Sequence, residues 1–171
     1  DMTRVEGQVT NGTTIRMGGM SNGVGQMVAE VVRLATTRKA PVSRLRIFGH
    51  GKEGVMGISV GTGASPGYSP KLRSSLDFQN LNAIKADLEK LTPHFAEGAI
   101  VELFGCSTGG GANGNALLSG LANLWGVEVK AGALVQYYGT PDQTNAFEGP
   151  VMSAKPGQPV AQKREKPVAV D

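Results

Sequence analysis

The sequence predicts an α/β domain with a mostly parallel sheet and helices on both faces. Two observations carry this prediction. Short apolar runs bounded by glycine alternate along the chain with segments whose apolar residues recur at helical spacing. The chain also has 171 residues, of which 40% are hydrophobic, so it is long enough for one domain with a core of its own.

The first half of the chain supplies three predicted strands and one helix. Residues 13–17 (TTIRM) are predicted as a strand, and apolar residues at helical spacing over 24–38 predict a helix with one apolar face. Residues 45–48 (LRIF) and 55–60 (VMGISV) read as further strands. The loop over 61–75 has no periodicity and carries Pro66, Gly67 and Pro70, and loops of this length are usually functional or mobile.

The second half repeats the alternation. Leucine and isoleucine spacing predicts a helix over 81–91 that stops at Pro93, and 99–104 (AIVELF) reads as a buried parallel strand. A second amphipathic helix over 117–125 and a strand from 127 to 129 follow. This alternation of strands and helices is typical of a sheet covered by helices.

We place the domain boundary after residue 149. Residues 1–149 are predicted as one domain, and the proline-rich residues 150–171 as an extended or disordered tail or linker. The alternative is a segment that lies along the domain or in its groove. The chain begins with Asp1 rather than Met, from which we expect a module of a larger protein.

Composition excludes several classes of function. The net charge is only +3 and basic residues cluster only at Lys163, Arg164 and Lys166, so nucleic-acid binding is not expected. No run of about 18 apolar residues predicts a membrane span, and no signal-peptide core is present, so we expect a soluble chain with no readable address. One cysteine and two histidines predict neither a disulfide nor a metal site, and no cofactor is expected.

The stretch VELFGCSTGGGANG, residues 101–114, fits three catalytic or binding patterns. Gly105–Gly109 matches the G-x-S-x-G nucleophile elbow, with Ser107 as the attacking group. The glycines at 109, 111 and 114 match the G-x-G-x-x-G turn that binds a pyrophosphate. The third interpretation makes Cys106 the nucleophile.

The first two patterns lack their partners. An α/β-hydrolase needs a histidine after the serine, and both histidines, His50 and His94, precede Ser107. His50-Gly51 still resembles a lipase oxyanion motif, so the Ser107 alternative stays open. The dinucleotide pattern needs an acidic residue about 20 positions on, and only Glu128 lies near.

Cys106 and His50 are predicted to lie close together. Each follows an apolar strand after one glycine, and parallel strands present their carboxyl ends at one edge of a sheet. Neighbouring strands lie about 4.8 Å apart, so an imidazole and a thiol there come within reach of each other. The structural alternative is a small core cysteine and a polar Gly-His-Gly turn.

This pair has a defined chemistry. A thiol is mostly protonated at neutral pH, and an adjacent histidine can take the proton and stabilise the thiolate. The glycine-rich start of the following helix favours a negative sulfur. The backbone amides of Gly51 and Cys106 are candidates for an oxyanion hole. Glu53, Asp77 and Asp142 are candidate orienting acids, and residues 61–75 and 133–144 are candidate cleft walls.

The strand that ends in FGHG and the strand that ends in GCS about 55 residues later resemble the caspase-like (clan CD) cysteine peptidases. They are most similar to the self-cleaving cysteine protease domains of bacterial toxins, and residues 101–132 are similar to CHAT-type relatives. The resemblance implies a caspase-like three-layer α/β sandwich with a His50–Cys106 dyad that cleaves a peptide bond. Alanine precedes the cysteine in caspases, where this chain has Gly105.

The resemblance also implies partners and a setting. These are a peptide or protein substrate, an inhibitor or immunity protein, and delivery or secretion within a larger bacterial toxin, effector or surface protein. The alternative from another class is a non-catalytic interaction module that binds a partner in the same crevice. Neither interpretation implies a cofactor, a metal, a nucleic acid or a membrane.

Overall fold

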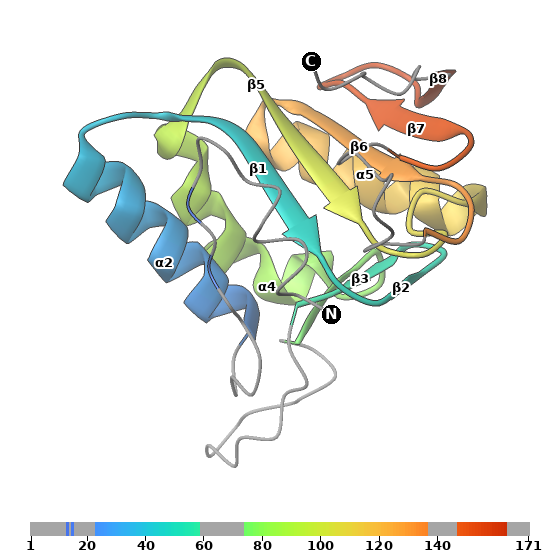
Figure 1. The fold of residues 1–171 in the computed structure, drawn as a ribbon, viewed down its shortest axis with the longest axis horizontal. Helices are drawn as coiled ribbons and strands as arrows, with labels where there is room; N and C mark the ends of the chain where they lie inside the picture. The colour runs from blue at the N-terminus through green and yellow to red at the C-terminus, as the bar shows by residue number, and fades with distance from the viewer. Residues whose placement is uncertain (1–12, 14, 16–22, 59–73, 137–146, 164–171) are drawn as a thin grey trace, which may run out of the picture.

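The computed structural model describes residues 13, 15, 23–58, 74–136 and 147–163. Within these ranges the chain forms a mixed α/β fold (Figure 1). Most of the predicted strand over residues 13–17 and most of the two candidate cleft walls lie outside the described residues. The elements are α2 (Gly23–Arg38), β1 (Val42–Phe48), β2 (Gly51–Lys52), β3 (Val55–Gly57), β4 (Ser75–Asp77), α4 (Leu81–Leu88), the 3-10 helix η1 (Glu89–His94), β5 (Phe95–Phe104), α5 (Gly111–Trp125), β6 (Glu128–Gly132), β7 (Val151–Ala154) and β8 (Ala161–Lys163).

The larger sheet is mixed rather than mostly parallel. Its strand order is β1-β5-β6-β7-β8. The pairs β1–β5 and β5–β6 are parallel, while β6–β7 and β7–β8 are antiparallel. The strands β2, β3 and β4 form a second, antiparallel sheet. The parallel part is therefore the half that was predicted from the apolar runs, and it is the half that carries His50 and Cys106.

The three described α-helices share one face of the larger sheet, which corrects the expectation of helices on both faces. α2, α4 and α5 pack in one core with the sheet residues Ile47, Val101, Leu103 and Val129 (Figure 1). Side chains alternate between the two faces of a strand, so their neighbours in sequence point the other way. On that opposite face the side chains of Arg44, Arg46, Glu102, Glu128 and Lys130 are aligned by the strand register.

An ion pair explains how the opposite face carries a buried acid. Glu102 is only 5% exposed, and its carboxylate accepts a 2.8 Å bond from Nε of Arg46. A second guanidinium, that of Arg44, lies 3.5 Å away. Paired charges can be buried where a single charge cannot. The charges on this part of the opposite face are therefore paired with one another.

The expected tail is, over residues 151–163, part of the sheet. β7 pairs with β6 and contributes the fully buried side chains of Val151 and Ala154. β8 then pairs with β7 and forms the edge. The prediction of a tail or linker was wrong here because β7 (VMSA) and β8 (AQK) are short and mix apolar with polar residues. Such strands give no strong apolar pattern in the sequence.

Two of the four prolines that suggested disorder, Pro156 and Pro159, lie in the connection between these strands. The N–H of Gln158 donates to the carbonyl of Lys155 at 3.1 Å and closes the turn. Pro156 precedes Gly157, whose φ is +68°. Proline followed by a glycine with positive φ is the pattern of a type II turn. Proline therefore marks a hairpin connection at this point of the chain.

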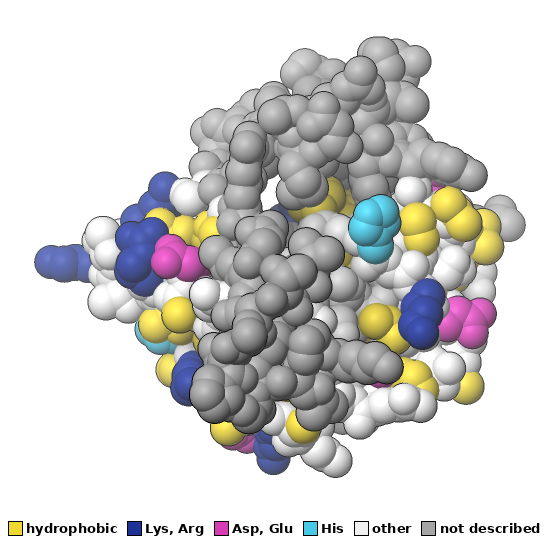
Figure 2. All heavy atoms as spheres, turned by 90° about the horizontal axis from the view of Figure 1, so that it is seen from below, with side chains coloured by type: hydrophobic (Ala, Val, Ile, Leu, Met, Phe, Trp, Pro, Cys, Tyr) yellow, Lys and Arg dark blue, Asp and Glu magenta, His cyan; other side chains and the backbone are white. Residues whose placement is uncertain are grey.

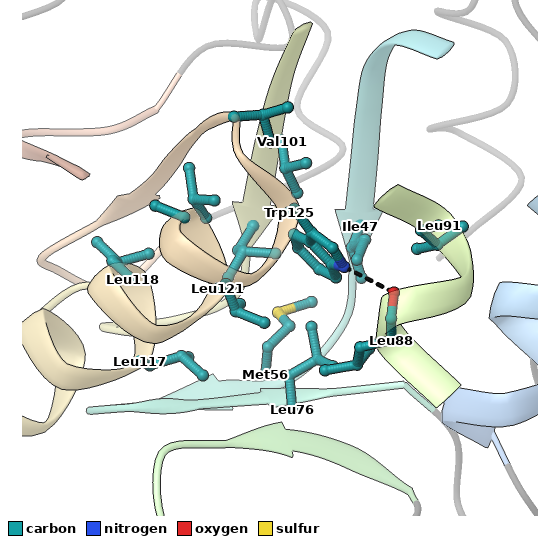
Figure 3. Close-up of a cluster of buried hydrophobic side chains, with 14 of the residues drawn as sticks. Ile47, Met56, Leu76, Leu88, Leu91, Val101, Leu117, Leu118, Leu121 and Trp125 are labelled. Atoms are coloured by element: carbon teal, nitrogen blue, oxygen red, sulfur yellow. Dashed lines mark hydrogen bonds between the residues drawn. The ribbon is translucent and has the colours of Figure 1, made fainter. Parts of the chain in front are cut away.

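The core joins the two sheets (Figure 3). Met56 and Leu76, from β3 and β4, are fully buried and point toward Leu117 and Leu121 of α5. The indole of Trp125 donates to the carbonyl of Leu88 at 3.0 Å, which satisfies its one donor inside the cluster. The predicted helices over 24–38, 81–91 and 117–125 are thus confirmed in position, although the second continues as η1 through Pro93.

Candidate functional site

The strand register places His50 and Cys106 at the same edge of the larger sheet. Phe48 and Phe104 are the last paired residues of the parallel strands β1 and β5. Each is followed by one glycine and then by His50 or Cys106. The two phenylalanine rings stack with centroids 4.7 Å apart, and Phe147 stacks on Phe104 at 4.3 Å. The ends of the two strands are therefore held by a three-ring stack just before the candidate residues.

Two glycines bring the segments after these strands into direct contact. A Cβ atom on Gly51 would lie 2.9 Å from the Cα of Gly105 and 2.3 Å from Oγ1 of Thr108. A Cβ atom on Gly105 would lie 3.1 Å from the Cα of Gly51. Side chains larger than hydrogen have no room here. The residue after His50 thus touches the residue before Cys106.

Thr108 fixes the Cys106 turn to the β2–β3 hairpin. Its side chain is fully buried, and its hydroxyl donates to the carbonyl of Val55 at 3.1 Å. Its own carbonyl accepts from the N–H of Gly54, also at 3.1 Å. Ser107, next to it, has φ of +55°, a left-handed conformation that is rare outside glycine. The turn is therefore tightly constrained around the cysteine.

A second set of hydrogen bonds ties the Cys106 turn to the loop after β6. The N–H of Ser107 donates to the carbonyl of Leu134 at 2.8 Å, and that of Gly109 to Gly132 at 2.9 Å. The thiol of Cys106 donates to the carbonyl of Gln136 at 3.5 Å. Residues 132–136 thus form one side of the site, as expected for the start of the 133–144 wall.

Gln136 holds that loop in place. Its side chain is 4% exposed, and its amide nitrogen donates to the carbonyls of Leu134, Val135 and Glu148 at 3.0, 3.3 and 3.0 Å. Its amide oxygen accepts from the N–H of Glu148 at 2.8 Å. All the polar atoms of this buried amide are used, as burial requires. Gln136 therefore fixes the carbonyl that faces the thiol.

The imidazole of His50 is exposed, and the described part of the chain contains no hydrogen bond or ion pair to it. In particular, no hydrogen bond joins His50 to Cys106.

His94 cannot replace His50 as the partner of Cys106, because His94 ends η1 at the start of β5 and Cys106 follows the end of that strand. Ten strand residues separate them, about 33 Å at 3.3 Å per residue.

The two candidate oxyanion amides have no main-chain acceptor among the described residues. Gly57 donates to the carbonyl of His50 at 2.8 Å, so the next pair, Gly51–Met56, is a non-hydrogen-bonded pair of the antiparallel ladder. The N–H of Gly51 therefore points away from β3. Cys106 lies in the turn after β5, where its N–H makes no bond to the described backbone.

The N-terminus of α5 already has an anion beside it. The helix begins at Gly111 with Gly110 as N-cap and no side-chain capping bond. The carboxylate of Glu53 lies over this first turn, about 3 Å from where a Cβ atom on Gly111 would be. A negative group at a helix N-terminus is favourable. The helix start was expected to stabilise a thiolate at Cys106. In the structure the carboxylate of Glu53 lies beside this helix start.

The other candidate acids do not orient His50 in the described structure. Asp77 accepts a bond from the N–H of Gln79 at 3.0 Å, within its own turn. Asp142 lies outside the described residues. Glu53 and Asp77 instead line a shallow groove of about 340 Å³ with Lys52, Phe78 and Asn113. This groove lies along the β2–β3–β4 sheet.

Figure 2 shows the side of the molecule toward which β1 and β5 run. The described Lys and Arg side chains lie mainly at one end of this view, and a histidine is exposed toward the other end.

The described ranges contain no group of three or more His, Cys, Asp or Glu side chains that could hold a metal ion. None of the helices that the structure describes is both long and apolar enough to cross a bilayer.

Sequence reasoning missed Thr108 and Gln136. Thr108 gave a weak signal, as a β-branched polar residue between glycines. Gln136 gave none, because its partners are two neighbouring carbonyls and a residue twelve positions later. Both residues act by fixing the backbone around Cys106.

The fold and the site define a class: a mixed α/β domain whose adjacent parallel strands deliver a histidine and a cysteine to one edge of the sheet. Residues 3–139 match a family described as a domain of unknown function, DUF4347, and the chain belongs to that family. No curated protein and no solved structure matches the chain.

Proposed function

We propose that this chain is a cysteine endopeptidase of caspase-like architecture. His50 takes the proton of the Cys106 thiol, and the sulfur attacks the carbonyl carbon of a peptide bond. The oxyanion of the tetrahedral intermediate is held by the amides of Gly51 and Cys106. The C–N bond then breaks, and His50 returns its proton to the leaving amine. Water, deprotonated by His50, hydrolyses the thioester and releases the acid and the free thiol.

The proposal depends on the closeness of the segments that carry His50 and Cys106. Phe48 and Phe104 are register partners, and Gly51 and Gly105 are in backbone contact. These two relationships put an imidazole and a thiol on adjacent turns at the carboxyl edge of a parallel pair. That edge is where open α/β sheets bind ligands. The amides of Gly51 and Cys106, which have no main-chain acceptor in the described part of the chain, add the donors that acyl transfer needs.

The thiol of the free protein donates to the carbonyl of Gln136 rather than to His50. Catalytic hydrogen bonds are often absent before substrate binds and form in the complex. His50 is exposed and unbonded to described residues, so its imidazole is free to rotate toward the sulfur. The proposed mechanism requires the imidazole to turn toward the sulfur when substrate binds.

Alkylation of the thiol tests the dyad. We would follow iodoacetamide labelling of Cys106 by intact mass between pH 5 and pH 9, in the wild type, His50→Ala and the matched control His94→Ala. The proposal predicts fast labelling well below pH 8 that slows at least about tenfold in His50→Ala and is unchanged in His94→Ala. If the labelling rate rises only near pH 8.5 and is the same in the wild type and His50→Ala, the proposed dyad is wrong.

Cleavage of a diverse peptide library tests the activity itself, with Cys106→Ala as the control. Products that form in the wild type and are absent in Cys106→Ala support an endopeptidase. Products that form equally in both proteins would redirect the assignment to Ser107, which has the left-handed φ of +55° in the same turn. The natural substrate in this proposal is a peptide or protein, and an inhibitor or immunity protein is the expected partner of a bacterial toxin module.

A second function, a non-catalytic interaction module, has one observation in its favour. The Cys106 thiol is engaged by the carbonyl of Gln136, and no hydrogen bond to His50 is present in the described residues. Under this alternative the edge of the sheet binds a partner without covalent chemistry. If labelling is slow and has the same rate in the wild type and His50→Ala, and no cleavage depends on Cys106, the interaction module is favoured over the peptidase.

A further inference from the structure

Among the candidate acids, Glu53 lies against the segment that follows Cys106. A Cβ atom on Gly111 would lie 2.9 Å from Oε2 of Glu53, and a Cβ atom on Gly110 would lie 3.4 Å from its Cγ. The same point on Gly110 is 3.1 Å from the carbonyl oxygen of Ser107, the residue after the cysteine. The side chain of Glu53 therefore lies across two glycines at the junction between the Cys106 turn and α5.

The main chain next to Glu53 holds the side chain in this place. The N–H of Gly54 donates to the carbonyl of Thr108 at 3.1 Å. A Cβ atom on Gly54 would lie 2.7 Å from the carbonyl oxygen of Asn113, so this turn also touches the first turn of α5. Gly54 has φ of +71°, a conformation that glycine adopts without strain. The β2–β3 turn is thus packed between the Cys106 turn and the helix.

The carboxylate of Glu53 makes no hydrogen bond and no ion pair within the part of the chain that the structure describes. The helix start beside it also lacks acceptors. The amides of residues 111–113 donate to no main-chain carbonyl in the same ranges, Gly110 as N-cap has no side chain, and the first turn of α5 contains no acid. These amides and the helix dipole form a positive end that favours an anion. Glu53 supplies that anion from a distant part of the chain.

We infer that Glu53 is a positioning residue for the proposed reaction, whose carboxylate occupies the positive end of α5 and thereby opposes formation of the Cys106 thiolate. This inference rests on the proposed function, in which that thiolate is the nucleophile. The carboxylate and the thiolate are two anions beside one helix start, and each like charge disfavours the charged form of the other. The reactivity of the thiol is therefore set by two opposing neighbours, the imidazole of His50 and the carboxylate of Glu53.

The other charged groups around the Cys106 turn do not take this position in the described structure. Lys52 and Asp77 line the same groove as Glu53, and Asp77 accepts a hydrogen bond within its own turn. On the other side, Glu148 contacts the loop after β6 through its main chain. His50 is the proposed base. The restraint on the thiolate is therefore assigned to Glu53.

Glu53→Gln tests the inference because it removes the charge and keeps the shape of the side chain. We would measure the rate of iodoacetamide labelling of Cys106 on the full chain, by intact mass, from pH 5 to pH 9 at low ionic strength. The pH of half-maximal rate is expected to fall by about 0.5 to 1 unit, which is about three- to tenfold faster labelling at pH 6. At the alkaline plateau the two proteins should react within about threefold of each other, because nucleophilicity changes only weakly.

Matched variants separate this charge from the other acids. Glu97→Gln removes the same charge near the start of β5, at the far end of the strand from Cys106, and is expected to leave the profile unchanged. Asp77→Asn removes a carboxylate from the same groove but not from the helix start, and is expected to give less than half of the shift. Glu53→Asp keeps the charge and should stay within about 0.3 pH unit of the wild type.

Salt supplies a further check. Dissolved ions screen the interaction between partly exposed charges, so the difference between the wild type and Glu53→Gln should shrink in 0.5 M NaCl. A merely structural role of the side chain would change stability but would not give a salt-dependent shift of the labelling profile.

The results that contradict the inference are distinct from those that contradict the peptidase. If Glu53→Gln has the profile of the wild type or a profile at higher pH, or if Asp77→Asn gives an equal shift, Glu53 does not restrain the thiolate from the helix start. The peptidase proposal then survives as long as His50→Ala still slows labelling. If Glu53→Gln shifts the profile but His50→Ala does not change it, the proposed dyad fails and the effect of Glu53 on the thiol remains. If neither variant changes the profile, both fail.

Discussion

The thiol of Cys106 donates a hydrogen bond to the main-chain carbonyl of Gln136, 3.5 Å away, and the buried side chain of Gln136 fixes that carbonyl in place. The amide bonds to Leu134 and Val135 on one side and to Glu148 on the other. A residue thirty positions after the cysteine thus determines what the sulfur faces. The environment of Cys106 is a property of the loop after β6 as much as of its own turn.

Gln136→Leu is therefore expected to destabilise the protein and to release the thiol. The carbonyl and the N–H of Glu148 would both lose their hydrogen bonds to Gln136, at up to about 1 to 3 kcal/mol for each of these part-buried groups. Urea unfolding measures the loss, and we expect about 2 to 4 kcal/mol. Gln158→Leu, in an exposed turn, is the control and should change stability by less than about 0.5 kcal/mol. Equal losses in both variants would contradict this role for Gln136.

Thr108 is expected to tolerate serine but not valine. Thr108→Val keeps the volume and removes the hydroxyl that donates to Val55, leaving that carbonyl short of a partner next to a fully buried side chain. The expected loss is about 1 to 3 kcal/mol in urea unfolding. Thr108→Ser keeps the donor and should lose less than the valine variant. A valine variant as stable as the wild type would show that the hydroxyl does not fix the Cys106 turn.

Gly51→Ala is expected to separate the two candidate turns. The added methyl group would overlap Oγ1 of Thr108 and the backbone of Gly105, so the hairpin must move. Overpacking of this kind costs about 1 to 3 kcal/mol. Gly120→Ala in α5 is the control, because its methyl group meets only the mobile end of Leu81. The thermal unfolding temperature and the rate of iodoacetamide labelling should change in Gly51→Ala and not in Gly120→Ala. An unchanged labelling rate in Gly51→Ala would show that the contact between Gly51 and Gly105 does not affect the site.

The positions of the helices and of the parallel strands could be predicted from the sequence. The helix over residues 24–38 has strong apolar periodicity, the strand over 99–104 is a continuous apolar run, and burial in the core follows both patterns. The approach of His50 and Cys106 to one edge followed from two strands that each end in a glycine. The register confirmed that these strands, β1 and β5, are neighbours.

The remaining features depend on contacts that no local pattern encodes. β7 and β8 are short strands of mixed apolar and polar residues, and they join the sheet by pairing with β6 and with each other. The side on which the helices pack depends on the polar face around Glu102, whose arginine partners lie more than fifty positions away. Gln136 bonds Glu148, twelve positions later. Long-range pairing of this kind requires the folded chain.

The attachment of the β7–β8 hairpin to β6 is expected to weaken in acid. Burial raises the pKa of the Glu128 carboxyl, but the hydrogen bonds from Lys163 and Ser153 outweigh it. The positive charges of Lys130 and Lys163 act in the same direction, so the pKa of Glu128 is lowered below its usual value. A carboxyl with a lowered pKa stabilises the fold at pH above its unfolded value, and that contribution disappears as pH falls through the folded value.

Glu128→Gln measures this contribution directly. The difference in unfolding free energy between the wild type and this variant should be at most about 1 kcal/mol near pH 7, because Lys163 is partly exposed and the pair is screened. The difference should shrink as the pH falls from about 5 to about 3, since the carboxylate is then protonated. Glu97→Gln, an exposed acid of β5 without an ion pair in the described structure, should show a smaller difference throughout. A Glu128 difference that stays constant across this pH range would mean that the carboxylate's charge does not hold the hairpin.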